Sequence, residues 1–238
     1  ERPLRILVIL SDPKDVAPRL QVEREWNRMQ EALSLLLASG AVTVTRLPTA
    51  TLAVLQNTLR QNAYHVLHFI GHGWFTETQA EGITPSIALP AGLLFENAQG
   101  NSEQVTADKL GVLLHDHSAT LRLAFLNSCE GARTGSANAF SGTAQYLVQQ
   151  NIPAVIAMQF PISDLAAINL AQAFYRALAD GYPVDAALAE GRKALFVLGS
   201  VIEWGTPVLF SRSADNQLFE PPSSAQRSFS TLLPFEPE

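Results

Sequence analysis

The sequence predicts an α/β fold, with a mostly parallel sheet of about six strands and helices on both faces. Short apolar runs alternate along the chain with segments of helical periodicity, which is typical of parallel strands joined by right-handed crossovers. The chain has 238 residues, of which 47% are hydrophobic. This is enough apolar material to bury one substantial core or two small ones.

The first half of the predicted sheet contains three strands. Leu4–Leu10 is a compact apolar run that ends at a Ser-Asp-Pro turn. A helix follows, because apolar residues recur at steps of three and four and a glycine comes just after the last of them. Its stripe is Val22, Trp26, Met29, Leu33 and Leu36, and the glycine is Gly40. The next elements are a strand at Val42–Leu47, a helix at Thr51–Gln61 and a strand at Tyr64–Ile70.

The segment from Gly73 to Gln104 interrupts this alternation. It is rich in Gly, Thr, Pro and Ser and carries one short apolar run, Gly92–Phe95. We therefore predict a long loop over residues 73–104 with a small hairpin inside it. Because long loops in compact domains are usually functional or mobile, we expect it to be poorly ordered or to shift on activation.

Strands and helices alternate again in the second half. Thr106–His115 reads as a helix with Thr106 as its cap. The remaining elements are a strand at Leu121–Leu126, a helix at Asn138–Gln150, a strand at Ala154–Met158, helices at Ser163–Ala179 and Val184–Leu195, and a strand at Val208–Ser211. Residues from about Asp215 onward show little periodicity and are expected to form an irregular tail.

Composition excludes several classes of function. The formal net charge of −6 argues against nucleic acid as a direct partner, because phosphate binding needs a basic face. No apolar run approaches the roughly 18 residues that span a bilayer, and no signal peptide is apparent, so no membrane partner is expected. A single cysteine offers no disulfide framework, which favours the cytoplasm.

Two short motifs carry reactive side chains. His72 ends the sequence His-Phe-Ile-Gly-His directly after the third strand, and Cys129 lies in Leu-Asn-Ser-Cys-Glu-Gly directly after the fourth. A thiol becomes a strong nucleophile when a nearby imidazole takes its proton. Ligands of open α/β sheets bind beyond the carboxyl ends of the strands. If these two strands are neighbours, His72 and Cys129 face one crevice.

These motifs, in this order, resemble the CHAT family of caspase-like cysteine proteases. In that family one strand runs into His-Phe-x-Gly-His-Gly and a later strand into a short cysteine loop. The segments Pro153–Met158 and Trp204–Phe210 are also similar, so that the resemblance covers about residues 4–212. It implies a caspase-like three-layer sandwich over residues 1–214, followed by the irregular tail at 215–238. It also implies a regulatory sensor or repeat module, in the same or another chain.

The resemblance implies a cysteine endopeptidase that acts on a protein substrate without cofactor or metal. His72 is then the general base and Cys129 the nucleophile. The amides of Gly73 and Cys129 form the oxyanion hole, in which two aligned N–H donors stabilise the developing charge. The alternative is a non-catalytic interaction or scaffold module with the same fold.

Two residues are tentative substrate-binding groups. Asn127 occupies the position at which related metacaspases and paracaspases carry an aspartate for a basic P1 residue. Asp164 could supply an acid to the same pocket, although a capping role for Asp164 or Ser163 at the start of the following helix is favoured. A basic P1 residue is slightly preferred over a small or neutral one, and Arg133 could reverse this order.

The other polar candidates have simpler interpretations. His65 and His68 are expected to be packing residues of the third strand. His115 and His117 suit a solvated helix end better than a metal site. Ser128 lacks a G-x-S-x-G elbow, and the role of Glu130 beside the cysteine stays open.

Overall fold

Six strands form a single sheet in the order β2-β1-β3-β7-β8-β9. The structure is a computed structural model that describes residues 3–75, 91–128, 137–160, 162–199 and 202–220. The strands of this sheet are β1 (Leu4–Leu10), β2 (Val42–Arg46), β3 (Val66–Gly71), β7 (Leu123–Ser128), β8 (Ala154–Met158) and β9 (Pro207–Ser211). The first five are parallel to their neighbours, and only β9 is antiparallel. The mostly parallel sheet of six strands predicted from the sequence is confirmed.

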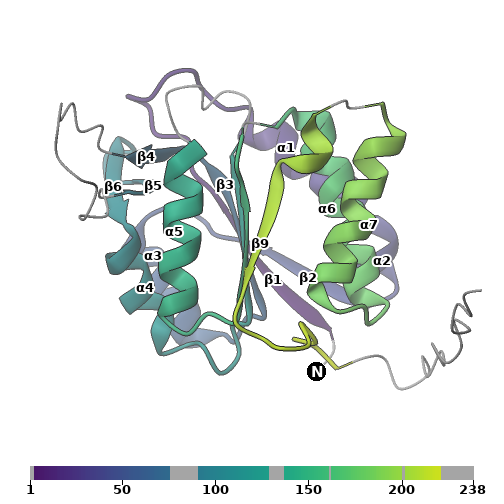
Figure 1. The fold of residues 1–238 in the computed structure, drawn as a ribbon. Coiled ribbons are helices and arrows are strands. Elements are labelled where there is room, and N and C mark those ends of the chain that lie inside the picture. The colour runs from purple at the N-terminus through teal and green to yellow at the C-terminus, as the bar shows by residue number, and fades with distance from the viewer. Residues whose placement is uncertain (1–2, 76–90, 129–136, 161, 200–201, 221–238) are drawn as a thin grey trace, which may run out of the picture.

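Helices cover both faces of the sheet, as Figure 1 shows, so the molecule has three layers. One face is covered by α1 (Val22–Ala32), α2 (Ser34–Ala38), α6 (Asp164–Ala179) and α7 (Val184–Val197). The other face is covered by α3 (Leu52–Gln61), α4 (Ala107–His115) and α5 (Ala137–Gln149). A short 3-10 helix, Glu203–Gly205, leads into β9.

The two faces of the sheet bury two separate hydrophobic clusters. In β1, Ile6 and Val8 belong to the cluster under α1 and α6, whereas Leu7 and Ile9 belong to the cluster under α3 and α4. Successive side chains of a strand point to opposite faces, so a strand buried on both sides reads as a continuous apolar run. This is why β1, β3, β7 and β8 are recognisable as mainly apolar runs, whereas the edge strand β2 alternates Val with Thr.

A second, smaller sheet follows β3. It consists of the antiparallel strands β4 (Gly73–Phe75), β5 (Ala91–Glu96) and β6 (Ser102–Thr106). The hairpin expected around Gly92–Phe95 is therefore part of a three-stranded sheet, and Gly73 begins a strand instead of a loop. Residues 76–90, which make up about half of the predicted loop, lie outside the described residues.

Two local predictions about helices were wrong. The helix expected up to Leu36 is interrupted at Leu33, where the backbone leaves the helical region with φ −95° and ψ 3°. The apolar stripe still faces the core, because spacing decides which side is buried and does not decide whether the hydrogen-bond ladder is continuous. Thr106 occupies the cap position of α4 but accepts no capping bond; its hydroxyl donates to Asp108 and lowers the pKa of that carboxyl.

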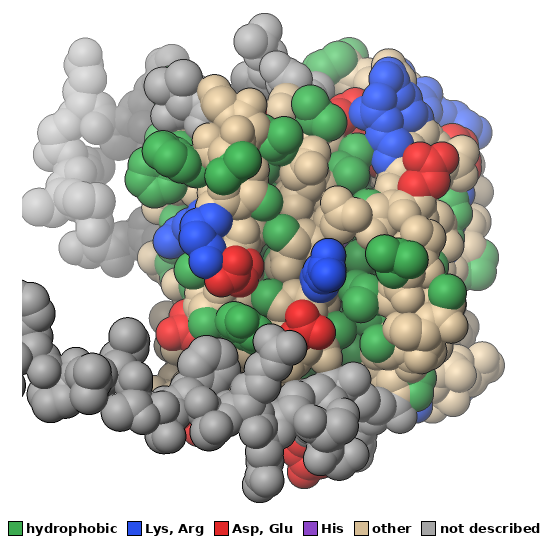
Figure 2. Space-filling view, turned by 90° about the vertical axis from the view of Figure 1, so that its right-hand side faces the viewer, with side chains coloured by type: hydrophobic (Ala, Val, Ile, Leu, Met, Phe, Trp, Pro, Cys, Tyr) green, Lys and Arg blue, Asp and Glu red, His purple; other side chains and the backbone are tan. Residues whose placement is uncertain are grey.

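The outer face formed by α7 and its neighbours carries scattered charges among apolar side chains, as Figure 2 shows. Phe196, Val197 and Leu198 are exposed at the end of α7. None of the helices in the described part of the chain combines the length and the apolar character that crossing a membrane requires.

Candidate functional site

The two motifs lie at the same end of two neighbouring strands. β3 and β7 pair in parallel, with Ile70 opposite Asn127 and Gly71 opposite Ser128. His72 follows Gly71 directly, and Cys129 follows Ser128 directly in the sequence. The condition set by the sequence analysis, that these strands are neighbours, is met. Cys129 itself lies outside the described residues.

His72 is held by a main-chain acceptor. Its side chain is buried, with 2% of its surface exposed, and Nε2 lies 3.2 Å from the carbonyl oxygen of Pro18. Because a carbonyl can only accept, Nε2 carries the proton of the neutral ring and Nδ1 has the free lone pair. Nδ1 is buried and has no hydrogen-bond partner among the described residues. The ring therefore presents an unused base on its Nδ1 side.

Burial also sets the charge of this imidazole. Desolvation lowers the pKa of His72 below its usual 6.5, and the hydrogen bond to Pro18 and the negative charge of Asp12 oppose that shift only in part. The ring is thus mainly neutral at pH 7, which is the form that accepts a proton from a thiol.

The small sheet fixes the backbone around His72. Leu94 N–H in β5 donates to the carbonyl of His72 at 2.9 Å, and the Leu94 carbonyl accepts the hydroxyl of buried Ser11 at 2.7 Å. This bond makes Gly73 and Leu93 the non-hydrogen-bonded kind of antiparallel pair. In such a pair the N–H of Gly73 points away from β5. The amide next to His72 is therefore not used by the β4–β5 ladder.

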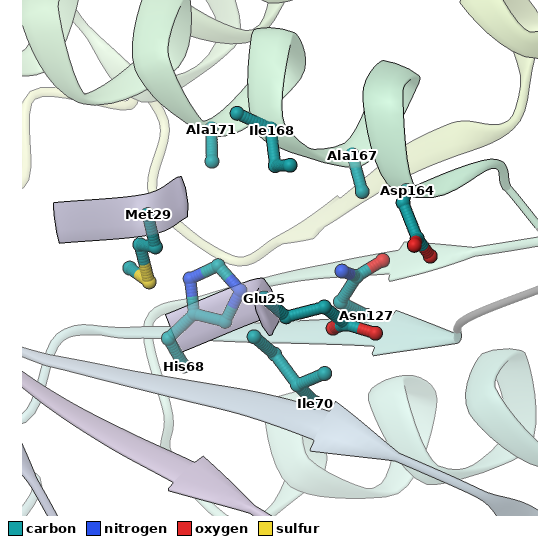
Figure 3. Close-up of a pocket in the computed structure, with 9 residues that line it drawn as sticks. All are labelled: Glu25, Met29, His68, Ile70, Asn127, Asp164, Ala167, Ile168 and Ala171. Carbon is teal, nitrogen blue, oxygen red and sulfur yellow. The ribbon is translucent and has the colours of Figure 1, made fainter. Parts of the chain in front are cut away.

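A pocket lies beside this strand end, between the sheet and helices α1 and α6. It is narrow: about 310 Å³ of space lies between its atoms when open solvent is counted, and about 20 Å³ of this has room for water molecules. Its lining residues are Glu25 and Met29 of α1, His68 and Ile70 of β3, Asn127 of β7, and Asp164, Ala167, Ile168 and Ala171 of α6. Figure 3 shows the carboxyl groups of Glu25 and Asp164 on either side of the Asn127 amide. Asn127 and Asp164, which the sequence analysis assigned to one pocket wall, lie in the same pocket.

The polar lining of the pocket consists mainly of carboxyl and amide groups. The Glu25 side chain belongs to a residue with only 6% of its surface exposed. Asp164 is about one-third exposed and lies 3.9 Å from the guanidinium of Arg28. The Asn127 Oδ1 atom is buried and accepts no hydrogen bond from a described residue. The pocket is therefore rich in oxygen acceptors.

His68 also lines the pocket, and its ring adds no positive charge there. Its ring stacks on Phe125 at 4.6 Å, and its Nδ1 lies 2.8 Å from the hydroxyl of Tyr175. Complete burial lowers the pKa of His68 to about 3, so the ring is neutral at physiological pH. The packing role expected from the sequence is what the contacts describe, but the ring also lines the pocket.

The remaining candidates occupy structural positions. Ser163 caps α6 by accepting the amide of Ala166, so Asp164 stands in the first turn, where a carboxylate favours the helix dipole and still reaches the pocket. His65 accepts the amide of Arg5 on its Nδ1. Among described residues, His115 and His117 do not join any group of three or more side chains that could hold a metal. Ser128 ends β7, and Glu130 and Arg133 lie outside the described residues.

Sequence reasoning missed two groups near the site. Pro18 contributes only its carbonyl, which every residue has, so no side-chain pattern could identify it. Glu25 left a detectable signal, because it falls three residues after Val22 and four before Met29, on the buried stripe of α1. A carboxylate at a buried helical position calls for a function or a partner.

Comparisons with known proteins identify the family of the chain. The family model for the CHAT domain matches residues 7–200. No curated protein matches the chain significantly.

Solved structures share the fold at low sequence identity. The protein GSU0716 from Geobacter sulfurreducens is 15% identical, with a TM-score of 0.50 over 92% of this chain and 97% of its own. Gingipain R, described as an Arg-specific cysteine proteinase, is 13% identical, with a TM-score of 0.51 over 91% of this chain; the match spans 47% of its own length. The Drosophila initiator caspase Dronc is 12% identical, with a TM-score of 0.46, over 89% and 81% of the two chains. The chain belongs to the CHAT domain family and has a caspase-like fold.

Proposed function

We propose that this protein is a caspase-like cysteine endopeptidase in which His72 and Cys129 form the catalytic dyad. The observation that carries the proposal is the register of β3 and β7, which pairs the residue before His72 with the residue before Cys129. Neighbouring strands lie about 4.8 Å apart, so the two chains leave the sheet side by side. A base with a free, buried Nδ1 at one of these ends is what a thiol at the other needs.

In the proposed reaction, Nδ1 of His72 takes the proton of the Cys129 thiol and the thiolate attacks the scissile carbonyl of a protein substrate. The amides of Gly73 and Cys129 donate to the developing oxyanion. His72 then protonates the leaving amine, and water, activated by the same imidazole, hydrolyses the thioester. The Pro18 carbonyl supports these steps because it accepts a hydrogen bond from Nε2 of His72. This bond keeps the proton of the neutral ring on Nε2 and leaves Nδ1, on the opposite side of the ring, free to act as the base.

We further propose that the pocket below Asn127 receives a basic P1 side chain. Glu25 and Asp164 supply carboxylates, Asn127 supplies an unused carbonyl oxygen, and neutral His68 adds no opposing charge. Arginine and lysine offer donors and a positive charge to such a lining, whereas an acidic P1 residue would meet like charges. Glu25 strengthens the basic preference beyond what Asp164 alone could support.

The dyad is tested by labelling the protein with iodoacetamide at pH 7 and measuring the product by mass spectrometry. Cys129 is the only thiol, so the site of labelling is unambiguous. We expect His72→Ala to slow labelling strongly, because the thiol then returns towards its ordinary pKa of about 8.5. The matched control is His115→Ala, which removes an exposed histidine and should label like the wild type.

Peptidase activity gives the second readout. Cys129→Ala and His72→Ala should each abolish it with the fold retained by circular dichroism, and the double variant should be no worse than either. Equal labelling in wild type and His72→Ala, together with no peptidase activity, would instead support a non-catalytic scaffold of the same fold.

A further inference from the structure

Asp12 holds the loop that carries the Pro18 carbonyl. It follows the end of β1, and only 7% of its side chain is exposed. One carboxylate oxygen, Oδ2, accepts Nε of Arg19 at 2.9 Å and Nη2 of Arg19 at 2.6 Å. The other, Oδ1, accepts the amide of Leu20 at 3.0 Å. The carboxylate thus binds the two residues that come directly after Pro18.

This arrangement determines where the Pro18 carbonyl points. The oxygen that accepts from His72 belongs to the peptide unit joining Pro18 to Arg19, and the side chain and following amide of Arg19 are tied to Asp12. We infer that Asp12, together with Arg19, is a positioning residue for His72, because the Asp12–Arg19 pair fixes the carbonyl that orients the imidazole. This inference rests on the proposed role of His72 as the base.

Asp12 is itself fixed from the small sheet. Its amide donates to Oε1 of Glu96 at the end of β5, and the Glu96 amide donates to the carbonyl of Ala50. A nearly buried carboxylate needs several donors to offset its desolvation, and Asp12 has Arg19 and the Leu20 amide for that purpose. Asp12 is therefore held by Glu96 through its amide, and it holds the residues after Pro18 through its carboxylate.

The negative charge of Asp12 and the hydrogen bond from His72 to Pro18 both raise the pKa of His72. Asp12 in turn contacts two charged residues, Arg19 through its carboxylate and Glu96 through its amide. Loss of the Asp12 carboxylate leaves Arg19 without its partner and weakens the Pro18 contact, so the pKa of His72 should fall further.

The inference is tested on the ring itself, by nitrogen-15 NMR of histidine-labelled protein. In the wild type at pH 7 we expect His72 to show the Nε2–H tautomer alone. Asp12→Ala should convert this to a mixture of both tautomers, and Asp12→Asn, which can still accept from Leu20, should give an intermediate spectrum. The matched control is Asp15→Asn, since the Asp15 carboxylate in the same loop accepts from the amide and hydroxyl of Ser102, at 2.6 and 2.8 Å, and not from the Pro18 segment. Unchanged ring signals in Asp12→Ala would overturn the inference.

Labelling of Cys129 by iodoacetamide separates this inference from the proposed function. We expect Asp12→Ala to slow labelling about 10- to 100-fold, because small displacements of a reacting group have effects of this size. Normal labelling in Asp12→Ala but slow labelling in His72→Ala would overturn the role of Asp12 alone. Equal labelling in wild type and His72→Ala would overturn the dyad, and the NMR result would still decide whether Asp12 orients His72.

A second variant covers the case in which Asp12→Ala fails to fold. Arg19 has 54% of its side chain exposed, so Arg19→Gln changes little of the core while removing the bond to Oδ2. Like Asp12→Ala, it should convert the single Nε2–H tautomer of His72 to a mixture of both tautomers. A folded Arg19→Gln protein with wild-type ring signals and wild-type labelling would contradict the inference.

Discussion

His72 depends on an acceptor that no motif marks. The sequence His-Phe-Ile-Gly-His-Gly identified the histidine as a candidate base, and its place beyond β3 follows from the apolar run before it. The contact with Pro18 joins residues 54 positions apart, and the acceptor is a main-chain atom. Such a contact depends on where the loop after β1 folds back, which composition and periodicity do not specify. At the residue scale, the chemical type was predictable and its orientation was not.

His68 gives a prediction about acid stability. Its pKa is about 3 in the folded protein, because burial penalises the charged ring, and about 6.5 in an unfolded chain. Between these values the unfolded chain binds more protons than the folded one, so the free energy of unfolding falls as the pH falls below 6.5. For this group the slope is about 1.4 kcal/mol per pH unit. We expect the free energy of unfolding of His68→Gln to decline less between pH 7 and pH 4 than that of the wild type. Urea unfolding at pH 7, 5.5 and 4 measures this difference.

Tyr175→Phe is the control for that experiment. It removes the hydrogen bond between Tyr175 and His68 but keeps the titrating ring. It should lower stability at pH 7 and retain the steep decline towards pH 4. Equal pH dependence in wild type and His68→Gln would contradict the prediction.

The secondary elements were predictable where burial is regular. The inner strands β1, β3, β7 and β8 are mainly apolar on both faces, the edge strand β2 alternates Val with Thr, and the α3 stripe through Leu55 and Leu59 is buried as expected. The small sheet was seen only as a hairpin, because β4 has three residues and β6 is short and mostly polar. The interruption of the first helix at Leu33 was missed for another reason. Leu33 is fully buried, so its hydrophobicity fits a continuous stripe equally well.

Gly92 makes the small sheet testable as an element. A Cβ placed on Gly92 would lie 2.0 Å from the carbonyl oxygen of Val105 and 2.8 Å from Nε1 of Trp74. The backbone of β6 cannot yield locally without disturbing its pairing with β5. We expect Gly92→Ala to lower the free energy of unfolding by about 1–3 kcal/mol, as overpacking does elsewhere. Urea unfolding at pH 7 measures it.

Gly205→Ala is the matched control, because in the part of the chain that the structure describes no atom beyond the chain neighbours lies within 4 Å of a Cβ at that position. It should change the stability far less than Gly92→Ala. Since Leu94 in the same strand holds the carbonyl of His72, Gly92→Ala should also slow labelling of Cys129. Equal stability of the two alanine variants would show that β5 and β6 separate without cost.

At the scale of the whole molecule, the sequence predicted the layers but not the order of the strands. Alternating strands and helices require a layered α/β structure, and this was found. Physical patterning does not determine that β3 lies between β1 and β7, since each of these strands is apolar on both faces and could pair with any other. The sequence therefore left this order open, and the structure supplies it. The pocket depends on this order, because it joins α1, β3, β7 and α6.

The charge of this assembled pocket leads to the last prediction. Profiling a peptide library that varies at P1 should show arginine and lysine preferred, because two carboxylates line the pocket. Glu25→Gln and Asp164→Asn should each lower kcat/KM for an arginine substrate by about tenfold, which corresponds to about 1.4 kcal/mol. A norleucine substrate should change little. The loss should be larger for Glu25→Gln, because Glu25 is nearly buried whereas Asp164 is partly screened by solvent and by Arg28.

Arg28→Gln is the control of opposite sign. Its guanidinium lies 3.9 Å from the Asp164 carboxylate and carries the positive charge that competes with a basic P1 side chain. Its removal should raise kcat/KM for the arginine substrate, and this gain should disappear in the Arg28→Gln, Asp164→Asn double variant. An unchanged basic preference in both Glu25→Gln and Asp164→Asn would remove this pocket from P1 recognition. A preference for acidic P1 residues would contradict the electrostatic argument altogether, because carboxylates would then meet inside the pocket.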